Sequence, residues 1–108
     1  IAQLKKVEVE IVGRFSDLLT ELSVRQDANG SLLDQTTVLF GSNLGNANSH
    51  AAKNLPILLA GGGFRHGHHV AHDSQHNAPL SNLFVTMLQS MRIETDSFAQ
   101  SAGALNWA

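Results

Sequence analysis

The chain has 108 residues, which is enough for one domain with a modest hydrophobic core. Its formal net charge is -2, and its seven lysine and arginine residues are scattered along the sequence. This distribution argues against nucleic acid and anionic lipid as partners. The absence of cysteine excludes disulfides, thiol catalysis and thiolate metal sites. Apolar runs are much shorter than the roughly 20 residues that span a bilayer, so we expect no membrane insertion.

An amphipathic helix is predicted in the first part of the chain. Apolar residues recur there at steps of three and four: Leu4, Val7, Ile11, Phe15, Leu18 and Leu22. Two features speak against a helix. Residues 7–11 alternate as a half-buried strand would, and Gly13 costs a helix about 1 kcal/mol relative to alanine. We favour the helix because its pattern extends over more residues.

Two short apolar segments predict β-strands. The first covers residues 36–40 and follows a turn cluster at 27–30, and the second covers residues 55–60, with Pro56 at its start or on a sheet edge. Both segments lack alternation, which is typical of strands that are covered on both faces in parallel sheets. The predicted fold class is therefore α/β, as part of a three-layer α/β/α domain with parallel strands.

Loops, a turn and a second helix are predicted for the rest of the chain. Residues 41–54 are expected to form an ordered loop with a helical turn near residues 50–53, and the three glycines at 61–63 permit a sharp turn. A short strand within residues 66–73 and an amphipathic helix over residues 80–91 follow. The apolar residues of the tail are isolated, so we expect the tail to dock on a surface.

The predicted strands are too few for a complete α/β sheet, which indicates that further strands come from other sequence. The chain begins with Ile1 rather than methionine, and its first residues lack the pattern of an export signal. We therefore expect residues 1–108 to be a single segment, the C-terminal fragment of a larger α/β domain from which upstream sequence has been removed.

The loop at residues 41–54 is the first candidate site. It follows a predicted strand, and its small residues allow close approach while its polar side chains offer hydrogen-bond donors and acceptors. It could bind an oxyanion, a hydroxyl or a metal-bound ligand. The candidate ligand-binding residues are Asn43, Asn46, Asn48 and Lys53, and His50 is a candidate metal ligand. The alternative is a tightly turned loop whose asparagines hydrogen-bond to its own backbone.

The second candidate site is rich in histidine. It contains His66, His68, His69, His72, Asp73 and His76. Clustered imidazoles with a carboxylate are suitable ligands for zinc, nickel or copper. His68 and His69 are the candidate ligands here. On a strand, His66 and His68 would share one face, and on a helix His68, His69 and His72 could do so. The spacing does not match the His-Glu-x-x-His motif, and adventitious metal binding is the competing interpretation.

Motifs of nucleophilic and phosphate-loop chemistry are absent from the sequence. Ser42 lies outside any Gly-x-Ser-x-Gly motif, so a catalytic triad has no support. The glycines at 61–63 match neither Gly-x-x-x-x-Gly-Lys-Ser/Thr nor Gly-x-Gly-x-x-Gly. We interpret them as a turn.

Four motifs, in order along nearly the whole chain, resemble a known family. They are LLDQTTVLFGS at 32–42, NLPILLAGGG at 54–63, HGHHVA at 66–71 and NAPLSNL at 77–83. Together they resemble the C-terminal end of a family of exported bacterial proteins without an assigned function. Members of that family are several times longer and typically carry a twin-arginine signal. At the superfamily level the family is similar to alkaline phosphatases and sulfatases.

The resemblance implies a periplasmic or secreted parent protein with a three-layer α/β/α domain. Such domains bind one or two metal ions, here zinc, calcium or manganese, at strand ends. The segment at residues 38–45 would take the position of their metal-binding segment. Asn43 and Leu44 stand where those enzymes have a metal-binding Asp-His pair.

The implied function is hydrolysis of phosphate or sulfate esters at a degenerate metal site. His50 would bind metal or stabilise developing charge, and the asparagines of the loop would orient a small anionic ester. The rest of the parent polypeptide is the other expected partner. The alternative is a non-catalytic binding or scaffold domain that retains the fold.

Overall fold

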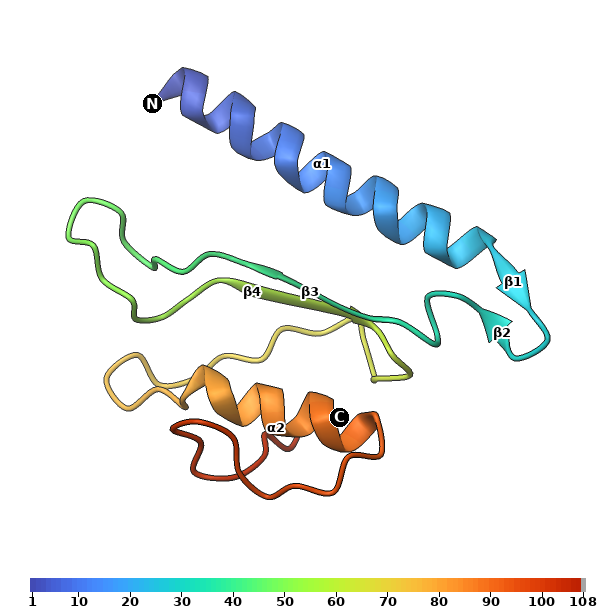
Figure 1. Ribbon diagram of the computed structural model, residues 1–108. Helices are drawn as coiled ribbons and strands as arrows, with labels where there is room; N and C mark the ends of the chain where they lie inside the picture. Colours follow the sequence, from blue (N-terminus) through green and yellow to red (C-terminus); the bar gives the residue numbers. More distant parts are fainter. Residues whose placement is uncertain (108) are drawn as a thin grey trace. The chain divides into compact units, whose positions relative to one another are not determined.

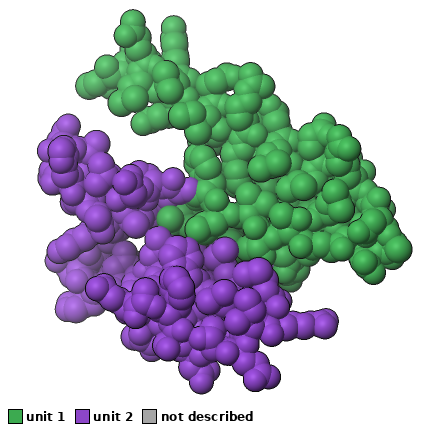
Figure 2. All heavy atoms as spheres, in the orientation of Figure 1, with its two compact units in different colours: residues 1–40, 57–63 green, residues 41–56, 64–108 purple. Residues whose placement is uncertain are grey.

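A computed structural model describes residues 1–107 of the chain. Its helices and strands, in chain order, are α1 (Ala2–Val24), β1 (Gln26–Asp27), β2 (Gly30–Ser31), β3 (Thr37–Gly41), β4 (Ile57–Gly61) and α2 (Leu80–Ser90) (Figure 1). The chain divides into two compact units, which Figure 2 shows in different colours. The first comprises residues 1–40 and 57–63, and the second comprises residues 41–56 and those from 64 onward.

The predicted amphipathic helix is confirmed as α1, which has 23 residues. Its C-terminal half packs within the first unit. The ring of Phe15 stacks on that of Phe40 in β3, with 4.9 Å between the ring centroids. The carbonyl of Leu22 accepts a hydrogen bond of 3.1 Å from the amide of Leu33. Phe15 and Leu22 of the predicted apolar stripe are thus partly buried, whereas Leu18 of the same stripe is 47% exposed.

The strands form two antiparallel pairs, β1 with β2 and β3 with β4. In the β1–β2 hairpin, Gln26 pairs with Ser31 and Asp27 with Gly30. The two strands predicted from apolar runs are present as β3 and β4 (Figure 1). The predicted fold class is nevertheless wrong, because the described residues contain no parallel strands and no three-layer α/β/α arrangement.

The connection between β3 and β4 explains this error. A parallel pair needs a crossover connection, usually a helix. Residues 42–56 contain no helix. The amide of Ser42 donates to the carbonyl of Pro56 at 3.3 Å, so the two ends of the connection lie side by side, as they do in an antiparallel pair. The strands are not covered on both faces either, since β3 has no buried residue and Leu58 in β4 is 49% exposed. An apolar run without alternation therefore did not indicate a parallel strand here.

The glycines after β4 form the sharp turn that the sequence predicts. Gly61, Gly62 and Gly63 have φ angles of 71°, 66° and 73°, in the left-handed region that favours glycine. A Cβ atom on Gly61 would overlap the backbone carbonyl oxygens of Leu33 and Thr36. This close approach of two backbone segments makes Gly61 the most constrained of the three.

The second predicted helix is confirmed as α2, in the second unit. Pro79 is its N-cap residue, with φ at -58°. Leu83 and Val85 in α2 are the buried apolar residues of the described chain, and Asn82 beside them is the buried polar one. The most buried positions of the second unit therefore lie in the first half of α2.

The tail docks on α2, as expected from its isolated apolar residues. The ring of Phe98 meets that of Phe84 edge-on, with centroids 6.0 Å apart. The amide of Ala102 donates to Oδ1 of Asn82 at 2.8 Å, which gives the side-chain oxygen of that buried residue a partner. Further along, Trp107 stacks on Phe64 at 5.7 Å between centroids.

Two smaller predictions are wrong. The helical turn expected at residues 50–53 is replaced by a turn at residues 47–50, closed by a bridge between Asn46 and Ala51. The strand expected within residues 66–73 is irregular backbone, in which Gly67 has a φ angle of 86°. The first segment is not helical because His50 has a φ angle of 51°, outside the right-handed helical region. The second segment has no partner strand among the described residues.

Candidate functional site

The predicted loop site is a small self-bonded hairpin. The amide of Gly45 donates to the carbonyl of Ala51 at 2.9 Å, and the amide of Ala51 donates to the carbonyl of Asn46 at 3.1 Å. A Cβ atom on Gly45 would overlap the carbonyl oxygen of Lys53, so the two sides of the hairpin touch. The shape of the loop is thus set by backbone contacts within it.

The side chain of Asn46 stabilises the tip of this hairpin. Its Oδ1 accepts hydrogen bonds from the amides of Asn48 at 3.0 Å and Ser49 at 3.1 Å. His50 completes the turn with a φ angle of 51°, in the left-handed region. The asparagine oxygen that the sequence offered for a ligand is therefore bonded to the loop itself, as in an Asx turn.

The other predicted loop residues lie on the surface of the second unit. Asn43, Asn48, His50 and Lys53 are all exposed. Asn54 was not among the predicted site residues, yet its Oδ1 accepts a hydrogen bond of 2.8 Å from Nδ2 of Asn77. No local pattern signals this contact, because 23 positions separate the two residues.

The histidine-rich segment is exposed throughout residues 66–76. Oδ1 of Asp73 accepts hydrogen bonds from the amides of His76 at 2.8 Å and Gln75 at 2.7 Å. These amides, that of His76 foremost, lower the pKa of the Asp73 carboxyl below its ordinary value. Nδ1 of His76 lies 3.6 Å from the same oxygen. Asp73 therefore organises a turn in this segment.

The divalent metal implied by the resemblance needs several convergent ligands. Among residues 1–107, no group of three or more histidine and acidic side chains is placed to hold a metal ion. His50, His68 and His69 are thus not brought into such a group. The residues described here do not fit a metal site that this chain builds alone.

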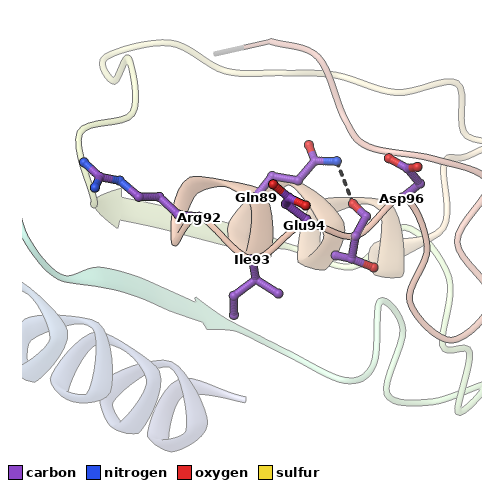
Figure 3. A pocket seen from close by; sticks show the side chains of 6 residues that line it. Gln89, Arg92, Ile93, Glu94 and Asp96 are labelled. Atoms are coloured by element: carbon purple, nitrogen blue, oxygen red, sulfur yellow. Dashed lines mark hydrogen bonds between the residues drawn. The ribbon is translucent and has the colours of Figure 1, made fainter.

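Two surface depressions lie beside α2 and its C-terminal end. A polar one of about 570 Å³ is lined by Gln89, Arg92, Ile93, Glu94, Thr95 and Asp96. Figure 3 shows Arg92 and Asp96 at opposite ends of it, and Nε2 of Gln89 donates to the carbonyl of Thr95 at 2.8 Å. An apolar one of about 230 Å³ is lined by Phe84, Met87, Leu88, Met91 and Phe98. Neither involves a residue of the two predicted sites.

Comparison with protein-family models, with curated proteins and with solved structures gave no match to this chain. Within the described residues, no helix has both the length and the apolar character needed to cross a membrane.

Proposed function

We propose that this chain is a non-catalytic scaffold or binding segment, whose helix α1 packs against another part of a larger, exported protein. The observation that supports this is the exposure of the α1 stripe. No residue of α1 is buried, and Leu4, Val7 and Ile11 are 61%, 54% and 49% exposed. Exposed apolar surface of this kind marks an interaction site.

The stripe is continuous with a contact that the chain already makes. Leu4, Val7 and Ile11 precede Phe15 at helical spacing, and Phe15 stacks on Phe40. The N-terminal half of α1 therefore extends the same face beyond the surface that the first unit supplies. An aliphatic side chain gains about 1.5–3 kcal/mol when it is moved from full exposure to full burial. For three half-exposed side chains, covering the stripe would gain roughly 2–5 kcal/mol.

The predicted loop gives less support to ester hydrolysis, the competing hypothesis from the family resemblance. Asn46 uses its side-chain oxygen within the loop, and the described residues offer no group of three metal ligands. A hydrolase site in this chain would need His50 to act with groups supplied from elsewhere. The scaffold proposal needs a partner surface for α1, but it needs no additional metal ligands or catalytic groups.

Dye binding tests the α1 surface. A dye that fluoresces on exposed apolar surface is titrated into the wild-type chain, a Leu4→Lys/Ile11→Lys double variant and a Val9→Lys variant. Val9 is the matched control, because it is 63% exposed but lies on the opposite side of the helix. We expect the double variant to lose most of the dye signal and Val9→Lys to keep it. Equal signals from all three proteins would contradict the proposal.

Hydrolysis assays test the competing hypothesis. The chain is incubated with an aryl phosphate and an aryl sulfate in the presence of zinc, calcium or manganese, alongside a His50→Ala variant. We expect no difference between the two proteins, because His50 lies on an exposed turn without convergent ligands. Turnover that the His50→Ala substitution abolishes would overturn the non-catalytic proposal in favour of ester hydrolysis.

A further inference from the structure

The hairpin between β1 and β2 contains an acceptor sequence for N-linked glycosylation. Residues 27–31 read Asp-Ala-Asn-Gly-Ser, so Asn29 is followed by a residue other than proline and then by Ser31. Asp27 supplies an acidic residue two positions before the asparagine, the additional feature that bacterial oligosaccharyltransferases require. No other asparagine of the sequence has serine or threonine two positions after it. We propose that Asn29 is an acceptor site for an N-linked glycan.

The structure places this sequence where a transferase can reach it. The pairs Gln26–Ser31 and Asp27–Gly30 leave Asn29 in the two-residue turn of the hairpin, and its side chain is exposed. Glycosylated asparagines lie on the surface because the glycan is bulky and hydrated. The backbone amide of Asn29 donates to Oδ1 of Asp27 at 2.8 Å. Within the described residues, no hydrogen bond involves the side-chain amide of Asn29.

Several other asparagines have side chains that are already engaged. Oδ1 of Asn46 is bonded within its loop, Asn54 and Asn77 bond to each other, and Asn82 is buried. Asn48 is exposed, but His50 occupies the position where the acceptor sequence requires a hydroxyl. Sequence pattern and accessibility therefore coincide at Asn29.

The hairpin is also easily opened. A transferase reads the acidic residue, the asparagine and the hydroxyl residue together, so the acceptor segment must leave its own contacts. The strands have two residues each, and such a short pair is marginally stable by itself. Oγ of Ser31 is engaged only with the amide of Asp34, at 3.1 Å, among the bonds of the described residues. Oδ1 of Asp27 would also have to leave the amide of Asn29 at 2.8 Å and Nε2 of Gln35 at 2.9 Å. These contacts are exposed, and exposed segments open locally at a lower cost than global unfolding.

The reaction needs a glycan donor of the polyprenyl-pyrophosphate class and no oxidant. Nδ2 of Asn29 attacks the anomeric carbon of the first sugar, which forms a carbon–nitrogen bond. The bond from that carbon to the pyrophosphate oxygen breaks, and the polyprenyl pyrophosphate leaves with the electron pair. The proton lost from Nδ2 passes to a base of the transferase. Asn29 retains one amide hydrogen on the glycosylated nitrogen.

The test directs the 108-residue chain to the periplasm of bacterial cells that contain such a transferase and its lipid-linked glycan. A reference acceptor peptide fused after the last residue reports that transfer is active. The intact mass and peptide mapping of residues 27–31 are measured. We expect a glycan on Asn29 in the wild-type chain and in Ser31→Thr, and none there in Asn29→Gln, Ser31→Ala or Asp27→Ala.

Two results would overturn the proposal. One is an unmodified Asn29 in molecules whose reference peptide carries the glycan. The other is a glycan on the chain outside the reference peptide that persists in Asn29→Gln. The matched control Asn48→Gln should leave the modification of Asn29 unchanged. Misfolding cannot imitate the expected losses, because oligosaccharyltransferases also accept unfolded chains. This proposal rests on the export that is part of the proposed function. The hairpin is separate from the α1 stripe, so the glycan experiment and the dye experiment fail independently.

Discussion

Replacing Thr86 with valine removes the hydroxyl that ties the tail to α2. Oγ1 of Thr86 donates to the carbonyl of Leu105 at 2.9 Å and accepts from the amide of Leu105 at 2.8 Å. The amide of Leu105 keeps a second acceptor, the carbonyl of Asn82 at 3.3 Å, whereas the only bond described for the carbonyl of Leu105 is lost. A part-buried polar group left unsatisfied costs about 1–3 kcal/mol. We expect Thr86→Val to lower the free energy of unfolding of the second unit by about that amount.

Trp107 is the one tryptophan of the chain and provides the assay. It stacks on Phe64, and its carbonyl accepts a hydrogen bond of 3.2 Å from Arg65, so its fluorescence reports docking of the tail. In urea titrations of Thr86→Val, the fluorescence transition should move to lower urea than in the wild type. Thr86→Ser keeps the hydroxyl and should stay close to the wild type. A loss in Thr86→Ser as large as in Thr86→Val would refute the reasoning, since the methyl group would then matter more than the hydroxyl.

Three further predictions concern the first unit. A Cβ atom on Gly13 meets nothing within 4 Å, so Gly13→Ala should stabilise α1 by about 1 kcal/mol, measured by far-UV circular dichroism during thermal unfolding. Gly61→Ala should lower the free energy of unfolding by about 2–5 kcal/mol, because it adds a steric overlap to an unfavourable φ angle. Gly63 has a φ angle in the same region but open space around it, so Gly63→Ala should lower that free energy by only about 1–2 kcal/mol. Chemical denaturation of both variants measures the difference. The backbone amide of Asn29 and, to a smaller extent, the side chain of Gln35 lower the pKa of Asp27. The stabilisation that ionised Asp27 gives to the folded chain is therefore complete above the unfolded-state pKa and is lost as pH falls through the folded-state pKa. An NMR titration should therefore give a lower midpoint for Asp27 in the folded chain than in urea; equal midpoints would contradict this.

The helices were predictable because their signals are local. The stripe from Leu4 to Leu22 repeats over five turns, and that length outweighed both Gly13 and the short alternation beside it. Pro79 and the apolar spacing after it were likewise sufficient to locate α2. The glycines at 61–63 predicted a turn because few other residues adopt three consecutive positive φ angles.

Strand direction was not predictable from the same kind of signal. The apolar runs in β3 and β4 indicated strands, but their direction depends on how residues 42–56 return, and that is decided by contacts such as Ser42 with Pro56. The β1–β2 hairpin was seen only as a turn, since strands of two residues are too short to show alternation.

The candidate loop was located by its composition, but its chemistry was not. Asparagine and serine at strand ends suit both ligand binding and local turns. The bonds from Asn48 and Ser49 to the side chain of Asn46 favour the turn, and they follow from spacing of two and three positions that the sequence already shows. The contact between Asn54 and Asn77 carried no such signal.

The small amount of buried surface bears on both the fold and the proposed function. In the described chain, Leu83 and Val85 are the buried apolar side chains, while Leu4, Val7 and Leu58 remain about half exposed or more. Apolar area covered on folding is the main source of stability, so this chain by itself has little to offset its conformational entropy. A partner that binds the folded form and covers the α1 stripe would raise the free energy of unfolding in proportion to its binding. The stripe is thus better explained as a surface for assembly than as a defect of the fold.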